Sequence, residues 1–223
     1  MLKKLMLKKL LLKPLLLKAL LLMSFSFSVK ASDVEALVEI TRAIENYQAK
    51  FEQNIQDQFG NSKDKSSGHF IIQKPFKFVW QTESPFEQKI VSNGETLWTF
   101  DQDLDQVNIQ TLNKAMGNTP VFLLGANAET LQKTFNVKQL VSGDDAAKTF
   151  ELTPVEQGYA FERMLVLFKQ GKLKEILLLD TLGQKTIVEF SESTQNEALD
   201  TSVFEFTVPE GVDVVDSRQK EAP

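Results

Sequence analysis

The sequence predicts a single α+β domain in which a strongly curved antiparallel sheet, or open barrel, carries helices across one face. Three observations lead to this fold class. Apolar residues recur at helical spacing over residues 34–47, segments with two-residue alternation follow, and a helical insertion interrupts them near residues 117–135. No linker rich in Pro, Gly or Ser divides the chain, so one domain contains all of these elements.

The first predicted element is an amphipathic helix over residues 34–47. Ser32 and Asp33 offer a side-chain cap at its start, and Glu35 lies in the first turn. The apolar stripe consists of Val34, Leu37, Val38, Ile40, Ile44 and Tyr47. Such a stripe is typical of a helix that packs one side against a core.

Alternation of apolar and polar residues then predicts strands. Phe76, Phe78 and Trp80 alternate with Lys77 and Val79, which indicates a half-buried strand with one aromatic face. Further strands are expected at residues 137–141, 148–153, 160–169, 172–180, 184–191 and 203–208.

The dipeptide Asn93-Gly94 predicts a tight β-hairpin between residues 89–92 and 96–100. Both residues tolerate the positive φ angles that such a turn requires. Gly171 and Leu182-Gly183 supply turns between the later strands in the same way.

The insertion in the middle of the chain predicts two short helices. Thr119-Pro120 provides a cap followed by proline in the favoured first helical position. Residues 121–124 are apolar all round, which indicates either a lid over a cavity or a buried turn of the core. A second helix is expected to begin at Asn127 or Ala128 and to end at Phe135.

The first 31 residues have the layout of a secretory signal peptide. They contain seven lysines and no acidic residue, and an apolar run covers residues 19–29. Val29 and Ala31 supply the small residues at positions −3 and −1 before the cleavage site. We expect cleavage between Ala31 and Ser32. The run is shorter than the roughly 20 residues that span a bilayer, and an uncleaved anchor would have to include lysines. The protein is therefore expected in the periplasm.

The remaining domain, residues 32–223, is acidic. Removing seven lysines from 25 basic residues leaves 18 against 30 acidic residues, a formal net charge of −12. This charge disfavours nucleic acid as a partner and weakens residence on anionic lipid. The chain contains no cysteine, so neither a disulfide nor a lipidated N-terminal cysteine is expected.

Catalytic and metal sites find little support in the sequence. His69 is the only histidine, which excludes a metal site with several histidine ligands. The absence of cysteine excludes a thiol nucleophile. Asp101, Asp103 and Asp105 lack the glycine and the closing glutamate of a calcium loop, which favours a solvated turn. We therefore expect neither an enzyme nor a cofactor.

Phenylalanine is the unusual feature of the composition. The chain has 17 Phe but only two Trp and two Tyr, so its aromatic surface carries few polar groups. A barrel core explains most of these residues. An open barrel too wide to be filled by its own side chains would instead leave an apolar cavity.

Several segments together resemble the LolA family, the periplasmic carriers of outer-membrane lipoproteins. The matching segments are 74–80, Pro85, 90–98, 105–107, 117–120, 204–206 and 208–212. The resemblance covers about residues 33–218, and Ser92–Trp98 is its most specific part. It implies an incomplete, half-open antiparallel β-barrel with a helical lid covering a hydrophobic cavity.

The resemblance also implies where the site lies. The cavity strands contribute Phe76, Phe78, Trp80, Leu97, Trp98 and Phe100. The lid contributes Leu37, Ile40, Ile44, Val121, Phe122, Leu123 and Leu124. Alternation prevents all the strand residues from pointing inward, and we favour Phe78 and Trp80. Family members often have an arginine latch before the proline of this strand, whereas Lys74 stands here as a point charge without the planar fork.

The partners implied by the resemblance are acylated lipoproteins, an inner-membrane ABC transporter that releases them, and a lipid-anchored outer-membrane receptor. Because the chain lacks the receptor's N-terminal cysteine, it resembles the carrier, expected as a monomer. Two alternatives remain open: a periplasmic binding protein for another lipid or glycolipid, and a hydrolase with an unrecognised site.

Overall fold

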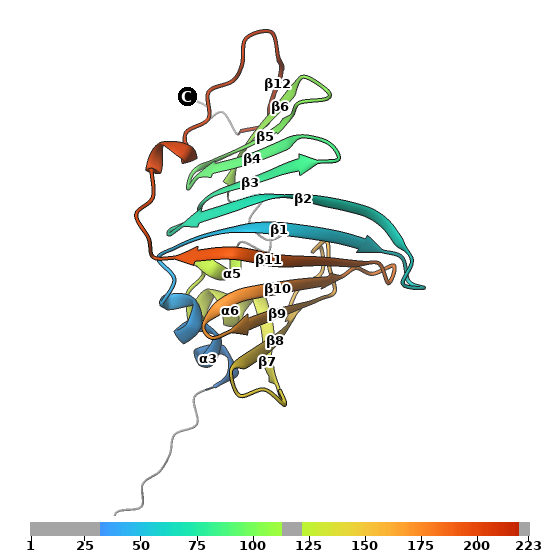
Figure 1. Cartoon of the computed structure of the whole chain (residues 1–223), viewed down its shortest axis with the longest axis vertical. Coiled ribbons are helices and arrows are strands. Elements are labelled where there is room, and N and C mark those ends of the chain that lie inside the picture. Colours follow the sequence, from blue (N-terminus) through green and yellow to red (C-terminus); the bar gives the residue numbers. More distant parts are fainter. Residues whose placement is uncertain (1–31, 113–121, 219–223) are drawn as a thin grey trace, which may run out of the picture. The chain divides into compact units, whose positions relative to one another are not determined.

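A computed structural model describes residues 32–112 and 122–218 of the protein. Within these residues a single twelve-stranded sheet carries three short helices, α3 (Asp33–Arg42), α5 (Phe122–Gly125) and α6 (Ala128–Thr134) (Figure 1). No helix in this part of the chain is both long and apolar enough to cross a bilayer.

The sheet is open, with the spatial order β12-β6-β5-β4-β3-β2-β1-β11-β10-β9-β8-β7. Its strands are β1 (Asn46–Gln56), β2 (Ser62–Gln73), β3 (Lys77–Ser84), β4 (Gln88–Asn93), β5 (Thr96–Asp101), β6 (Gln106–Thr111), β7 (Phe135–Leu140), β8 (Ala147–Pro154), β9 (Arg163–Lys169), β10 (Lys172–Leu179), β11 (Lys185–Gln195) and β12 (Asp213–Asp216). Neighbouring strands are antiparallel except β12 and β6, which are parallel. The expected α+β fold with an unclosed antiparallel sheet is confirmed.

Helix α3 begins as the sequence predicts and ends earlier. The Ser32 hydroxyl accepts a hydrogen bond from the Glu35 amide, and the Glu35 carboxylate accepts one from the Ser32 amide, which completes a capping box. The predicted end at residue 47 is wrong, because the backbone from Asn46 onward pairs with β2 and β11. Tyr47 is buried by strand pairing rather than by the helix.

The hairpin at Asn93-Gly94 is confirmed between β4 and β5. Gly94 has a φ of 99°, and the Asn93 side-chain oxygen accepts hydrogen bonds from the amides of Glu95 and Thr96. The second inserted helix is also confirmed, since Asn127 caps α6 by accepting from the Thr130 amide. The predicted cap at Thr119-Pro120 and the predicted lid residue Val121 lie outside the described residues.

The strand expected at residues 203–208 is not formed. Residues Thr201–Phe204 form a short 3-10 turn, η2, and the last strand is β12. The alternation in this segment arises because Phe204 and Phe206 both pack onto the sheet without pairing to a strand there. Strand β9 likewise begins at Arg163, later than expected.

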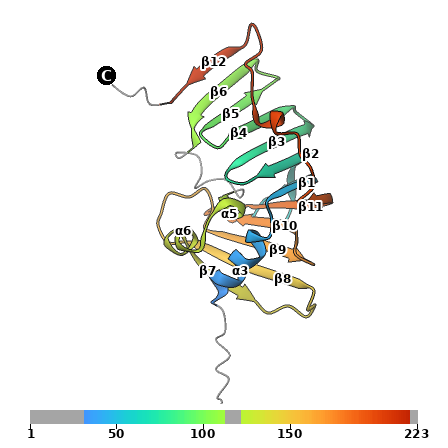
Figure 2. The same ribbon diagram turned by 90° about the vertical axis from the view of Figure 1, so that its left-hand side faces the viewer.

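The sheet has two different faces. Helices α3, α5 and α6 gather over the half of the sheet between β1 and β7 (Figure 2), and we call the face that they cover the helix face. The segment from Leu199 to Phe206 packs on the other face, the open face, over β3, β4 and β5. Because strand side chains alternate, neighbouring residues of one strand serve different faces.

Candidate functional site

An aromatic cluster forms the centre of the helix face. The rings of Phe51 and Trp80 stack with centroids 4.2 Å apart, and Phe70 lies 5.5 Å from Trp80. Phe190 is 5.7 Å from Phe70, and Phe78 is buried in the same core. Four neighbouring strands, β3, β2, β1 and β11, thus place large aromatic side chains side by side.

This aromatic cluster contains few groups that need a hydrogen-bonding partner. Its phenol, Tyr47, donates a hydrogen bond to the Leu173 carbonyl at 2.8 Å, and burial raises the pKa of Tyr47 to about 12. The phenylalanine rings need no hydrogen-bonding partner. A largely apolar aromatic surface of this kind matches the chemistry of an alkyl chain.

The helices contribute aliphatic side chains that cover the aromatic cluster. Leu37 of α3 and Leu123 and Leu124 of α5 are buried in the same core, and Ile40 of α3 packs against it in a partly buried position. Ile44, expected on the lid helix, is also buried there, but it lies in the connection after the end of α3. Phe76, predicted in the strand, lies in the β2–β3 turn just before β3, and its side chain is also partly buried in this core. The side chain of Phe122 lies outside the described part of the structure, although its backbone belongs to α5.

The structure separates the six strand residues expected at the site. Strand register places Ser92 opposite Leu97 and Val91 opposite Trp98, so Leu97 joins the helix face and Trp98 the open face. Phe100 follows Trp98 on the open face. Phe206 contacts both rings, at 6.2 Å from Trp98 and 6.0 Å from Phe100. We therefore leave Trp98 and Phe100 out of the candidate site.

Lys74 connects the sheet to the first helix. Its ammonium donates a hydrogen bond to the Thr41 carbonyl, 2.7 Å away at the end of α3. Partial burial lowers the pKa of Lys74, and the carboxylate of Glu45 opposes this shift. The same carbonyl accepts a hydrogen bond from the Ile44 amide at 3.0 Å, so the ammonium is a second partner of a carbonyl at the C-terminal end of the helix, where a cation is favoured.

A cavity of about 210 Å³ lies beside Lys74. It is lined by Val38, Thr41, Arg42, Lys74, Ala126, Asn127 and Ala128. These residues come from the end of α3, the β2–β3 turn and the start of α6. The cavity therefore marks a seam between α3 and α6.

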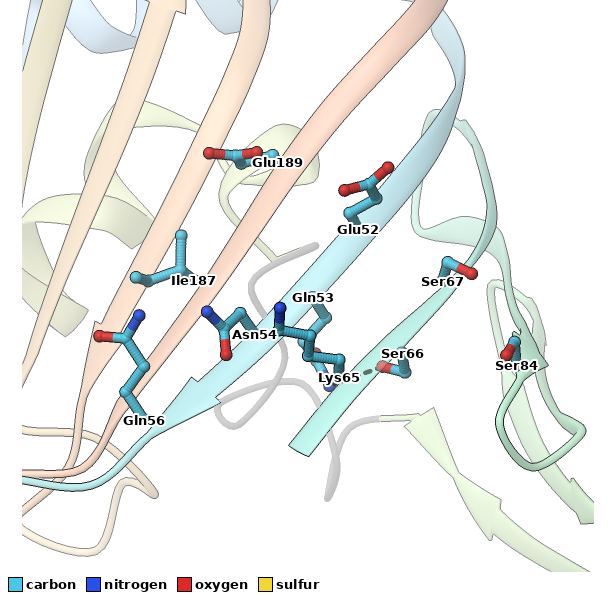
Figure 3. Close-up of a pocket in the computed structure, with 10 residues that line it drawn as sticks. All are labelled: Glu52, Gln53, Asn54, Gln56, Lys65, Ser66, Ser67, Ser84, Ile187 and Glu189. Atoms are coloured by element: carbon cyan, nitrogen blue, oxygen red, sulfur yellow. Dashed lines mark hydrogen bonds between the residues drawn. The ribbon is translucent and has the colours of Figure 1, made fainter. Parts of the chain in front are cut away.

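The other large hollows of the described residues differ in chemistry. A hollow of about 490 Å³ over β1, β2 and β11 is lined mainly by polar side chains, including Glu52, Asn54, Lys65 and Glu189 (Figure 3). Within the described ranges no three His, Asp or Glu side chains gather as a metal site would need. The helix face is the apolar candidate.

Several residues of the aromatic cluster were not predicted as site residues. Phe51, Phe70 and Phe190 lie on strands whose alternation is visible in the sequence, yet nothing local shows that β1, β2 and β11 adjoin β3. The pairing of β1 with β11 joins residues about 140 positions apart. Only the register brings these rings to Trp80.

The chain matches known proteins over most of its length. Residues 42–207 match the family model described as outer membrane lipoprotein carrier protein LolA. The outer-membrane lipoprotein carrier protein of Alcanivorax borkumensis is 34% identical over 87% of this chain and 93% of its own. The protein of that name in Nitrosomonas europaea is 38% identical, over 84% and 90%.

The fold has a counterpart among solved structures. An uncharacterized conserved protein of Thermus thermophilus aligns with a TM-score of 0.50 at 12% identity, over 82% of this chain and 97% of its own. At this identity the likeness concerns the fold alone.

Proposed function

The chain belongs to the LolA family of outer-membrane lipoprotein carrier proteins, and from this premise we propose that the helix face binds the acyl chains of a lipoprotein. The protein is a periplasmic lipoprotein-carrier chaperone. The observation that supports the proposed site is the aromatic cluster around Trp80, a continuous apolar surface under three short helices.

The energetics of the cargo explain why a carrier must cover it. An acyl chain with about 15 buried CH₂ groups represents roughly 12 kcal/mol of transfer free energy at ~0.8 kcal/mol each. Two or three such chains reach the practical ceiling of non-covalent affinity, about 18–21 kcal/mol. Release into water is therefore too slow to be useful, and delivery must be a direct transfer to an acceptor.

Binding requires the helices to move. Leu37, Leu123 and Leu124 occupy the space over the cluster, so an acyl chain has to displace them. The seam beside Lys74 is the place where α3 and α6 can separate, and opening there breaks the contact between Lys74 and Thr41. In this proposal Lys74 acts as the latch that sets the balance between closed and open helices.

The route follows from the carrier role. The cargo is received from an inner-membrane ABC transporter and passed to a lipid-anchored outer-membrane receptor. Residues 1–31 direct export and are removed, which leaves residues 32–223 as a monomeric carrier domain. The protein carries its cargo without altering it, so no catalytic step is involved.

The proposal is tested with inner-membrane vesicles that contain a radiolabelled lipoprotein and its active transporter. After addition of ATP, the label is expected in the supernatant in a one-to-one complex with this protein. Phe78→Glu should abolish transfer, because an ionised carboxylate on the helix face opposes alkyl burial. Phe100→Glu places the same charge on the open face and should still accept label.

Circular dichroism of both variants shows whether they are folded. Label that stays in the membrane despite an active transporter contradicts the carrier role. Free lipids or glycolipids, rather than triacylated peptides, extracted from the purified protein would instead support a binding protein for those molecules.

A further inference from the structure

Five hairpin connections follow one another along one end of the sheet. Strands β1, β3, β5, β8 and β10 all end there, toward the side to which the β1 and β3 arrows point in Figure 1. Each connection carries one large apolar side chain that is strongly exposed. In spatial order they are Leu104, Phe86, Phe59, Leu182 and Val155, and we call these five residues the apolar fringe.

The fringe is strongly exposed. The exposed fractions are 80% for Phe59, 81% for Leu182, 70% for Phe86, 68% for Leu104 and 52% for Val155. Of the eight large apolar side chains exposed in the described residues, these five share one end of the sheet. At the opposite end, the β4–β5 and β9–β10 hairpins have Asn93-Gly94 and Gln170-Gly171 at their tips. The β2–β3 turn at that end carries the partly buried Phe76, and the β7–β8 connection carries the fully exposed Val141. Among the described residues, exposed large apolar side chains are therefore more numerous at this end of the sheet than at the opposite one.

In three of the turns, a hydrogen bond within the turn satisfies a backbone amide that would otherwise need water. In each, an aspartate carboxylate accepts a hydrogen bond from the backbone amide of the fringe residue itself. The pairs are Asp57 with Phe59 at 3.0 Å, Asp101 with Leu104 at 3.2 Å, and Asp180 with Leu182 at 2.9 Å. Because these amides already have partners, the apolar tips can be desolvated without leaving a backbone donor unpaired.

We propose that the apolar fringe enters the headgroup region of a phospholipid bilayer and holds the protein transiently at a membrane surface. Successive tips are two strands apart, roughly 9–10 Å at the usual strand spacing. A protein partner would need a separate socket for each side chain, since interface cores are contiguous. A lipid surface accepts separated apolar side chains at any spacing.

The charges around the fringe select the lipid. Asp57, Glu87, Asp103 and Asp180 lie in or beside the turns, and the domain carries a formal net charge of −12. Anionic lipid is repelled by this surface, whereas a zwitterionic headgroup is not. Membrane contact is therefore weak and reversible, and it is independent of where the cargo binds.

The test uses the compact unit Ser32–Pro223 and phosphatidylcholine vesicles, with no lipoprotein present. The unit is expected to sediment with vesicles at millimolar lipid. Replacing four fringe residues together (Phe59→Ser, Phe86→Ser, Leu104→Ser and Leu182→Ser) should reduce the bound fraction at least about tenfold. Val141→Ser is the matched control, because Val141 is fully exposed but lies at the opposite end of the sheet.

A second measurement locates the contact. Phe86→Trp should gain fluorescence quenching by brominated phosphatidylcholine beyond that of the parent protein, and phosphatidylglycerol should weaken it at low salt. Absence of vesicle binding by the parent, equal binding by the four-residue variant, or no added quenching of Phe86→Trp would each overturn the proposal. Because no cargo is used, none of these results bears on the carrier function.

Discussion

The two faces of the β3–β5 region are covered in different ways. On the helix face, Phe78 and Trp80 belong to the same apolar core as the buried residues of the three short helices, and Lys74 ties the end of α3 to the sheet. On the open face, Val79 and Val91 lie under Phe204, which the chain delivers from its C-terminal part. Under the proposed function, alternate residues of the same strands therefore serve a cover that opens for cargo and a cover that stays closed.

The difference shows how one sheet can combine stability with a removable lid. A helix of ten residues or fewer is marginal alone in water, so α3, α5 and α6 depend on their packing against the rest of the domain, which the proposed cargo would replace. The segment on the open face leads into β12, which pairs with β6 and fixes it in place.

Phe204→Ala should give the largest loss of stability. The ring is completely buried with Val79 and Val91, and a Phe-to-Ala change in a core costs roughly 3 kcal/mol. Urea unfolding measures this loss. The folded fraction should still accept lipoprotein, and a loss of acceptance without a loss of stability would contradict the assignment of this face to stability.

The two tryptophans form a matched pair, one on each face and both half-buried. Trp80→Ala should lower lipoprotein uptake from vesicles about tenfold, because it removes the centre of the apolar surface. Trp98→Ala should change uptake by less than about twofold. Equal effects of the two substitutions would remove the distinction between the faces.

Lys74→Met should loosen α3 by about 1 kcal/mol, the value of one hydrogen bond to a partly buried carbonyl. Amide hydrogen exchange in α3 should accelerate about fivefold. Lys74→Arg keeps the donor and should restore protection. An unchanged rate of amide exchange in Lys74→Met would show that this lysine does not stabilise α3 against the sheet.

Glu175→Gln should have the smallest effect, and it should depend on pH. Partial burial, and then the carboxylate of Glu189 opposite it, raise the pKa of Glu175. A raised carboxyl pKa means that stability is lost as the pH rises through that value. Relief of this penalty should stabilise the variant by about 0.5 kcal/mol at pH 7 and by almost nothing near pH 3.5. A gain at acid pH instead would show the opposite sign.

The sequence predicts whether a segment is a helix or a strand better than it predicts which segments lie next to each other. Alternation in residues 76–80 and Asn93-Gly94 correctly indicated β3 and the β4–β5 hairpin, because the responsible interactions are local. The end of α3 was misplaced because pairing of Asn46 with two distant strands overrides helical spacing. The same long-range ordering explains why the strand expected at residues 203–208 is instead a cover for the open face.

The candidate site was predictable only in part. Phe78 and Trp80 were favoured by alternation, but the face of Leu97 relative to Trp98 depends on the β4–β5 register. The latch partner Thr41 precedes Lys74 by 33 residues, and no local pattern connects them. Residues that meet through register or tertiary contact remain hidden in a single sequence, whereas the periodicity of each strand does not.

The most direct test of the central claim uses the fluorescence of the two tryptophans separately. A triacylated lipopeptide is added to the Trp98→Phe protein, in which Trp80 alone emits, and to the Trp80→Phe protein, in which Trp98 alone emits. If the helix face is the acyl-binding site, the emission of Trp80 changes in intensity and wavelength while that of Trp98 stays constant. A change confined to Trp98 would place the acyl chains on the open face and contradict the account.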